Sequence, residues 1–245
     1  MNWIVIKPSE IIDQQNIQIL NTDLRFQHIQ NILKKQIGET VKVVVLNVGN
    51  FLFRICQFDN KVIVLEKETQ LETELRTVPI HTFLSLPRPQ TGKKILHLTA
   101  CYGISEVTFQ STQTKNKEYW TSPVYGKEMD LHLESGYAQT GNICPVAVRL
   151  FKTGDWKKNL PMNGKQIYAL DRSGESLQKE IKISQISTDE KPYFLFGPES
   201  GWLDNDLEFF RTMEIPILSL GKINLRTEFA YHALIHQCFI NSETK

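Results

Sequence analysis

The sequence predicts an α/β protein in which a mostly parallel sheet, flanked by helices, is preceded by a small β-barrel. Three observations support this prediction. Short apolar runs joined by tight turns crowd the first third of the chain. Beyond it, strand-like apolar runs alternate with helical segments, which is typical of a parallel sheet. Near the carboxyl end, two apolar runs each stop at a glycine and lead into a helix, as in the ligand crevices of parallel sheets.

The composition bounds the classes of protein that fit. A chain of 245 residues with 41% apolar residues can fill the core of one large or two smaller domains. Its 28 Lys and Arg residues against 27 acidic ones give no overall attraction to a polyanion, so any nucleic-acid contact must use local positive charge. The four cysteines form no C-x-x-C pair, which predicts reduced thiols and no metal site. No signal peptide or membrane-length apolar run occurs, and we expect a soluble, cytoplasmic protein without membrane contact.

Residues 1–75 are predicted to form the small β-barrel. Trp3 begins a short apolar strand, and residues 23–36 have helical spacing, with Thr22 or Asp23 as the cap and Gly38 after the end. The charged stretch 66–74 is predicted to be the connector to the next domain. Three further strands are expected at residues 41–46, 51–55 and 61–65.

Residues 76–245 are predicted to form the α/β domain. Helices are expected at residues 93–102, ended by Gly103, at 131–139 and at 227–240. Strands are expected at residues 78–86, 107–109, 167–170, 193–196 and 217–218. The apolar side of the last helix is predicted to contain Phe229, Ala230, Ala233, Leu234 and Cys238.

The two glycine-rich strand ends are the candidate ligand loops. Gly197, Gly201 and Gly221 can take a positive φ or let a ligand lie against bare backbone, and Pro198 stiffens the turn. The alternative is that these glycines simply form turns, as most glycines at strand ends do.

Three segments resemble one known family. FGPESGW resembles the GPEGG loop, LSLGKINLRTEFA resembles the LG-x-x-ILRTETA segment, and HIQNILKKQIGETVKVV resembles the HHL-x-x-VLR stretch of the RsmE-type 16S rRNA (uracil-N3) methyltransferases, a branch of the SPOUT class. The resemblance implies a PUA-like RNA-binding barrel in residues 1–75 and a SPOUT-type methyltransferase domain, with a trefoil knot near its carboxyl end, in residues 76–245. It also implies a homodimer.

In that family the knot loops hold S-adenosylmethionine, and apolar side chains around glycine turns suit its adenine. Taken singly, each leucine in these loops is as well explained as ordinary core. The resemblance assigns the cofactor to Leu170, Gly197, Pro198, Glu199, Gly201, Leu218, Leu220, Gly221, Ile223 and Leu225.

The expected chemistry needs a cation more than a metal. Uracil N3 carries a proton, so the site must stabilise the negative charge that develops on the base, and Arg226 is the candidate for this role. Glu199 is the second catalytic candidate because it can orient Arg226, although either residue can equally serve in a structural ion pair or cap. Arg25, Lys34 and Lys35 are candidate RNA contacts, with solvated surface charge as the alternative.

The chain departs from the family pattern at polar positions. Cys101 replaces a glutamate of ATELG, and Ser200 replaces a glycine of GPEGG. Residues 111–114 read STQT where the family has SERS, and residues 138–142 read AQTGN where it has EQSGR. The expected function is methylation of N3 of a uridine in 16S rRNA. Two alternatives stay open: a diverged SPOUT methyltransferase acting on another RNA, or a non-catalytic RNA-binding paralogue in which Ser200 blocks the cofactor.

Overall fold

The computed structural model describes residues 3–72, 77–162, 166–177 and 191–243, which divide between two compact units. The first unit comprises residues 1–76 together with 134–145, and the second comprises 77–133 and 146–245. The inclusion of 134–145 in the first unit was not predicted. It follows from contacts within that unit: the Asn47 amide donates to the Ile143 carbonyl over 2.8 Å. A Cβ on Gly141 would lie 2.6 Å from the Trp3 ring, so only glycine fits there.

The first unit is built on a curled sheet of six strands in the order β1-β4-β5-β6-β3-β2. Only the β1–β4 pair is parallel among the described pairs of this sheet. Side chains that alternate along the strands fill one core, which includes Val43, Phe53 and Leu65, all with no exposed surface. The strands are β1 (Trp3–Ile6), β2 (Ile11–Ile12), β3 (Asn16–Leu20), β4 (Thr40–Val45), β5 (Gly49–Phe58) and β6 (Val62–Gln70).

One helical segment covers this core. The 3-10 turn η1 (Pro8–Glu10) lies earlier in the chain, and α1 (Leu24–Gln27) begins at Asp23, whose carboxylate accepts from the Arg25 amide. The helix continues as the π-helix η2 (His28–Leu33). It ends at Lys34, which takes the left-handed conformation at φ 52°, so the expected termination near Gly38 is wrong.

The second unit contains a six-stranded sheet in the order β12-β10-β11-β7-β8-β9, with every neighbouring pair parallel. β8 and β11 are buried along their whole length, as expected for parallel strands covered on both faces. The strands are β7 (His81–Ser85), β8 (Glu106–Gln110), β9 (Ala147–Phe151), β10 (Ile167–Ser176), β11 (Tyr193–Phe196) and β12 (Ile217–Ser219).

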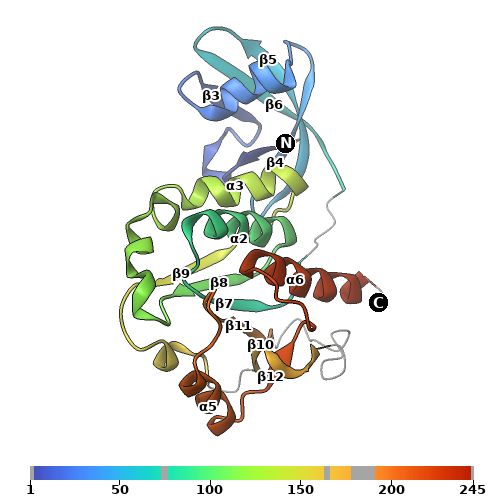
Figure 1. Ribbon diagram of the computed structural model, residues 1–245. Helices are drawn as coiled ribbons and strands as arrows, with labels where there is room; N and C mark the ends of the chain where they lie inside the picture. The colour runs from blue at the N-terminus through green and yellow to red at the C-terminus, as the bar shows by residue number, and fades with distance from the viewer. Residues whose placement is uncertain (1–2, 73–76, 163–165, 178–190, 244–245) are drawn as a thin grey trace. The chain divides into compact units, whose positions relative to one another are not determined.

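Helices lie on both faces of this sheet (Figure 1). None of the helices in the described part of the chain is long and apolar enough to cross a membrane. The α-helices are α2 (Pro89–Tyr102), α3 (Met129–Thr140), α5 (Asp204–Thr212) and α6 (Thr227–Glu243), and the 3-10 helices are η3 (Thr114–Thr121), η4 (Pro123–Tyr125) and η5 (Trp156–Asn159). α2 ends at Gly103, which has the predicted left-handed conformation at φ 63°.

The alternation along β11 shows which helices cover which face. Tyr193 and Leu195 belong to the core that contains Trp156 of η5 and Phe210 of α5. Phe196 points the opposite way, and its ring lies 5.4 Å from that of Tyr231 in α6. α6 lies beside α2 on this second face (Figure 1). The predicted mixed fold, with a mostly parallel sheet flanked by helices, is therefore confirmed.

Two element predictions need correction. The expected connector at residues 66–74 is strand for much of its length, because β6 runs on to Gln70 with its last side chains exposed. The last helix was expected to bury Phe229, but 58% of that side chain is exposed. The buried side of α6 is instead centred on Tyr231, whose hydroxyl bonds to the Thr99 hydroxyl at 2.7 Å and the Thr82 hydroxyl at 3.3 Å.

Candidate functional site

The carboxyl ends of the six parallel strands form one edge of the sheet, and the predicted ligand residues lie along it. β10 is hydrogen-bonded to both β11 and β12, and Leu170 pairs with Phe196 on one side and Leu218 on the other. The segments that follow these three residues are therefore neighbours. The topology brings together the residues predicted to bind the cofactor, although they are distant in sequence.

The first of these segments does not leave the sheet where the sequence suggested. β10 continues to Ser176, and its pairing with β12 is interrupted by a bulge between Leu170 and Glu175. At Gly174 an added Cβ would lie 2.3 Å from the Ile217 carbonyl oxygen, so a side chain there would push β12 away.

The second segment is fixed by an aromatic ring. The Trp202 indole nitrogen donates to the Leu170 carbonyl over 3.1 Å, which ties the loop after β11 to the end of β10. A Cβ on Gly197 would lie 3.0 Å from the same ring, so a larger residue there would press on the indole and displace it by a few tenths of an ångström.

Space for a ligand is found beside two other glycines. Gly201 and Gly221 have φ values of 86° and 127°, and no described heavy atom lies within 4 Å of a Cβ built on either. Beside Gly221, Ile223 is 76% exposed and Leu225 is 36% exposed. Bare backbone next to uncovered apolar side chains suits a small ligand with polar edges and an apolar face.

Arg226 stands at the start of α6. Its carbonyl accepts from the Phe229 and Ala230 amides at 2.9 Å, which makes it the N-cap residue. Its side chain is exposed and forms no ion pair within the described part of the chain. Two residues later, Glu228 is buried and accepts from the Lys94 ammonium at 3.0 Å. The guanidinium of Arg226 is thus free to face a ligand.

Glu228 keeps its charge despite its burial. Burial by itself raises the pKa of its carboxyl group, but the hydrogen bonds from its own backbone amide and from Lys94, with the nearby charge of Arg226, bring the net pKa below the ordinary value. The carboxylate therefore neutralises Lys94 and holds the amino end of α6 against α2.

Glu199 was expected to orient Arg226, but the two residues do not pair in the structure. Its carboxylate accepts from Nε of Arg88 at 2.8 Å. Arg88 precedes α2 in the loop after β7, the strand next to β11. Arg88 was not among the predicted site residues, because nothing in the sequence near Arg88 or Glu199 signals a contact between segments so far apart.

A buried hydroxyl holds the residue that precedes Arg88 in the chain. The Tyr125 hydroxyl donates to the Pro87 carbonyl at 2.6 Å. Burial, followed by the negative charge of Glu199, raises the pKa of Tyr125, so the hydroxyl stays a neutral donor at physiological pH. A Cβ on Gly92 would lie 2.4 Å from this oxygen, so α2 can approach Tyr125 only through glycine.

Further polar side chains lie along the same edge, in the loop after β8. Ser85 and Thr112 share a hydrogen bond of 2.5 Å, and the Trp120 indole donates to the Ser111 hydroxyl at 3.0 Å. Gln113 contacts the loop after β11: its amide oxygen accepts from the Ser200 hydroxyl at 3.2 Å, and its amide nitrogen donates to the Gly201 carbonyl at 3.5 Å.

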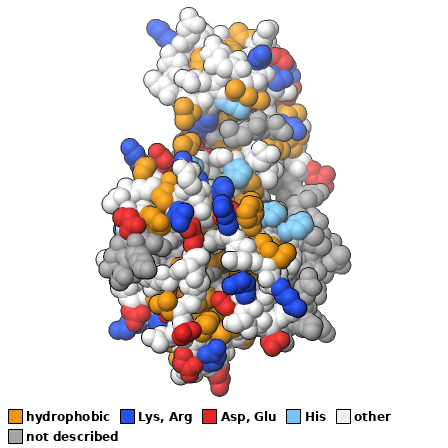
Figure 2. All heavy atoms as spheres, viewed as in Figure 1, with side chains coloured by type: hydrophobic (Ala, Val, Ile, Leu, Met, Phe, Trp, Pro, Cys, Tyr) orange, Lys and Arg blue, Asp and Glu red, His pale blue; other side chains and the backbone are white. Residues whose placement is uncertain are grey.

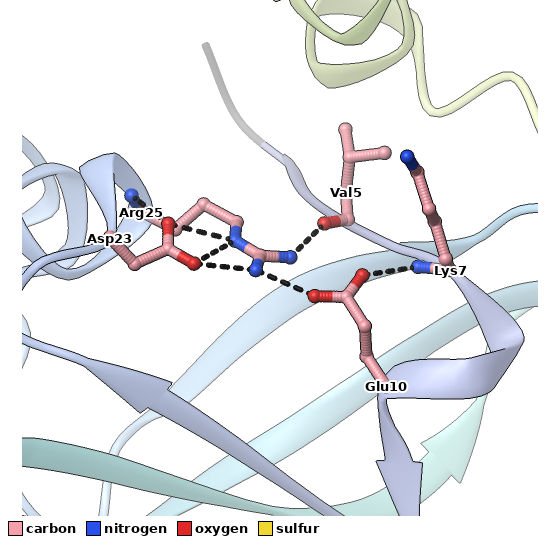
Figure 3. Close-up of polar contacts among 5 residues, drawn as sticks. All are labelled: Val5, Lys7, Glu10, Asp23 and Arg25. Atoms are coloured by element: carbon pink, nitrogen blue, oxygen red, sulfur yellow. Dashed lines mark hydrogen bonds and ion pairs between the residues drawn. The ribbon is translucent and has the colours of Figure 1, made fainter. Parts of the chain in front are cut away.

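The candidate RNA contacts of the first unit differ in availability. The Arg25 guanidinium donates to Asp23, Glu10 and the Val5 carbonyl, at distances between 2.6 and 3.0 Å (Figure 3). Burial lowers the pKa of Arg25, but these acceptors outweigh it and raise the pKa overall. Arg25 therefore holds β1, η1 and α1 together.

The two lysines are nearer to solvent. Lys34 is exposed, and Lys35 pairs with Glu39 at 3.0 Å. Exposed ion pairs of this kind contribute little to stability, so both ammonium groups can reach a phosphate.

Charge is mixed over the surface of the second unit. Figure 2 shows basic and acidic side chains interspersed on the face it draws. In the described ranges, no group of three or more His, Cys, Asp or Glu side chains could hold a metal ion.

The parallel sheet gathers glycine turns, uncovered apolar side chains and the exposed Arg226 at its carboxyl edge, and a family comparison specifies the class of protein. The model of the RNA methyltransferase domain matches residues 73–238, and the chain belongs to this family.

Individual relatives point in the same direction. The chain is 22% identical over 242 residues to the ribosomal RNA small subunit methyltransferase E of Treponema pallidum. The aligned region covers 94% of this chain and 87% of the relative. The resemblance noted in the sequence motifs is thus confirmed.

Two solved structures share the fold. The ribosomal RNA small subunit methyltransferase E of Neisseria gonorrhoeae, bound to S-adenosylmethionine, has a TM-score of 0.72 with 14% identity over 95% of each chain. A putative methyltransferase of Legionella pneumophila, also with the bound cofactor, has a TM-score of 0.74 with 17% identity over 97% of this chain and 96% of that one.

Proposed function

We propose that the protein transfers a methyl group from S-adenosylmethionine to N3 of a uridine in 16S rRNA of the small ribosomal subunit. The observation that carries this proposal is the juxtaposition at one sheet edge of three loop segments, two of them with open glycine backbone. The last of these segments leads into α6 at Arg226, whose exposed side chain has no ion pair among the described residues. The small-subunit methyltransferase of Treponema pallidum supports rRNA as the substrate.

In this proposal the cofactor is held by the segments that follow Leu170, Phe196 and Leu218. The cofactor lies against the open backbone at Gly201 and Gly221, and Leu220, Ile223 and Leu225 cover its apolar face. S-adenosylmethionine supplies a methyl group that the sulfonium already activates, so the chain mainly has to position the two substrates.

Arg226 has the second task. Uracil N3 releases its proton to solvent water, the N3 lone pair forms the new bond to carbon, and the carbon–sulfur bond breaks with its electron pair left on the thioether sulfur of the departing S-adenosylhomocysteine. Negative charge that develops on the base during this step is stabilised by a guanidinium, which stays protonated at any physiological pH. Glu199 supports the site through Arg88, by fixing the loop after β11.

The other expectations from the resemblance belong to the same proposal. We extend to this chain the trefoil knot near the carboxyl end, the PUA-like identity of the first unit, a homodimer and a cytoplasmic location. Lys34 and Lys35 are the proposed phosphate contacts of the first unit, while the contacts of Arg25 favour a structural role over RNA binding.

A second candidate, methylation of a different RNA, is favoured by one observation. Gln113 stands where the family segment SERS has an arginine, and Cys101 stands where ATELG has a glutamate. Both changes remove charge, and burial raises the pKa of the Cys101 thiol to about 11, which leaves this position neutral.

The test is a map of modified uridines in rRNA from a strain that lacks the gene. We expect one N3-methyluridine of 16S rRNA to disappear and to return with the wild-type gene but not with Arg226→Ala. Arg211→Ala removes an exposed arginine of α5 that pairs with Glu208, and it serves as the matched control that restores the mark. An unchanged 16S map rejects the first candidate, and a change confined to another RNA selects the second. Failure of the purified protein to bind S-adenosylmethionine in calorimetry would leave only the non-catalytic paralogue.

A further inference from the structure

The loop after β11 has two sides. β11 lies between β10 and β7 in the sheet, so this loop borders the proposed cofactor segments on one side and the loops after β7 and β8 on the other. The cofactor side contains the glycines and apolar side chains assigned above, together with polar residues such as Asp171 and Lys222. The other side carries polar side chains: Ser85, Arg88, Thr112, Gln113 and Ser200. An acceptor base must lie next to the methyl group, and this polar side is where hydrogen bonds are available to it.

Two departures from the family pattern meet on this polar side. Gln113 replaces the arginine of SERS, and Ser200 replaces a glycine of GPEGG. They are far apart in sequence, yet the Ser200 hydroxyl donates to the amide oxygen of Gln113 at 3.2 Å. The same amide donates to the carbonyl of Gly201 at 3.5 Å. The two changes therefore form one local unit, and Ser200 is turned toward Gln113.

Most polar groups near this point already have a protein partner. Ser85 bonds to Thr112, Arg88 to Glu199 and Tyr125 to the Pro87 carbonyl. Gln113 also has partners, but its amide nitrogen carries two hydrogens and only one of them has an acceptor in the described part of the chain. Its side chain is half-buried, and the oxygen and the nitrogen of its amide both contact the loop after β11. A held amide with a spare donor is suited to reading a carbonyl oxygen.

We propose, on the basis of the function proposed above, that Gln113 is a specificity-determining residue that donates the spare hydrogen of its amide to a carbonyl oxygen of the acceptor base, while Ser200 holds the amide in place. A keto pyrimidine such as uracil has such an oxygen on each side of N3. The hydrogen bond strengthens as negative charge develops on the base, so it favours the reacting form. In this chain a neutral amide thus takes over a position that is cationic in the family.

The first part of the test measures rate and cofactor affinity separately. The substrate is a small subunit reconstituted with 16S rRNA that carries the mapped target uridine. We expect Gln113→Leu to lower kcat/KM about tenfold, the size of one hydrogen bond, with the Kd for S-adenosylmethionine within twofold of wild type. Ser200→Ala should lower kcat/KM in the wild-type background and have no further effect in Gln113→Leu, since both act through one amide. Gln18→Leu, which removes an exposed amide of β3, is the matched control and should behave as wild type.

The second part detects the hydrogen bond itself. The target uridine is replaced by 4-thiouridine or 2-thiouridine, because sulfur is a weaker acceptor than oxygen. We expect one of these replacements to slow the wild-type enzyme about tenfold more than it slows Gln113→Leu. The effect of sulfur on the acidity of N3 acts on both enzymes alike and cancels in this ratio.

Three results would overturn the proposal. Equal sulfur effects in both enzymes would show that Gln113 does not contact the base. Parallel losses of kcat/KM and cofactor affinity in Gln113→Leu would make the residue a support of the cofactor loop. A Gln113→Leu enzyme as active as wild type would remove any role in the reaction. A wild-type protein that methylates no uridine is a different outcome, which refutes the underlying function rather than the part played by Gln113.

Discussion

Replacement of Gly221 by valine tests whether the loop after β12 receives the cofactor through its backbone. Gly221 has φ 127°, a region that a β-branched residue avoids. No described heavy atom lies within 4 Å of its would-be Cβ, and its neighbour Ile223 is 76% exposed. Among the described contacts, only the hydrogen bonds between the Gly221 backbone and the Ser219 hydroxyl, at 3.0 and 3.1 Å, resist a change of this loop. We expect the loop of the free Gly221→Val variant to relax to another conformation. The free energy needed to return it to the native conformation should then weaken the binding of the ligand.

The magnitude follows from the backbone. Holding a residue in a sparsely populated φ/ψ region costs about 1–3 kcal/mol. If binding of S-adenosylmethionine requires the native backbone at Gly221, the Kd rises about five- to 150-fold. Because the free loop relaxes, the melting temperature should fall by less than about 4 °C, the shift that 1 kcal/mol produces in a chain of this size.

The assay is isothermal calorimetry with S-adenosylmethionine, and the control is Gly38→Val. Gly38 has φ 88° and equally open surroundings, but it lies in the first unit. The reasoning is refuted if Gly221→Val binds the cofactor as tightly as wild type, or if Gly38→Val loses the same affinity.

Three further predictions concern the supports of the fold. Tyr231→Phe removes a fully buried hydroxyl that bonds to Thr99, and differential scanning calorimetry should show a stability loss of about 1–2 kcal/mol; an unchanged melting temperature would contradict this. The pKa of Glu228 is lower in the folded protein than in the unfolded chain. Its contribution to stability is therefore present above the unfolded pKa and is lost as the pH falls through the folded pKa. The difference in melting temperature between wild type and Glu228→Gln should narrow below about pH 4, and a difference that stays constant would be inconsistent with the ion pair to Lys94. Arg25→Ala leaves two carboxylates without their partner and should destabilise the first unit by about 2–3 kcal/mol in urea unfolding, whereas equal stability would mean that the contacts in Figure 3 contribute nothing.

The strands of the second unit were largely predictable, because strands that are buried on both faces need apolar residues at successive positions. β11 is buried throughout and was predicted within its observed bounds. β9 was missed, since none of its residues is fully buried and its sequence, Ala-Val-Arg-Leu-Phe, includes a charge. The end of β6 was missed for a similar reason, because its last five residues are exposed and polar and their pairing depends on β5.

In the candidate site, too, some features could be predicted from the sequence and others could not. The glycine turns were predictable because Gly201 and Gly221 must adopt conformations that few other residues accept. The partners of the polar residues were not. The contact of Glu199 with Arg88, and that of Ser200 with Gln113, depend on the strand order β11-β7-β8, which local sequence does not encode. The buried face of α6 was also not predictable from local sequence. Tyr231, whose hydroxyl has two hydroxyl partners, is buried in the core, whereas Phe229, which was expected there, is exposed.

The grouping of residues 134–145 with the first unit has a consequence for synthesis of the chain. On the ribosome, residues 1–76 emerge first, but the Asn47 amide and the Trp3 ring await a segment made much later. The amino-terminal unit cannot be completed before part of the methyltransferase family region has been translated. A fragment that ends at residue 76 would therefore lack residues 134–145 of its own unit, and a single crossover at this point would separate those residues from the strands that they contact.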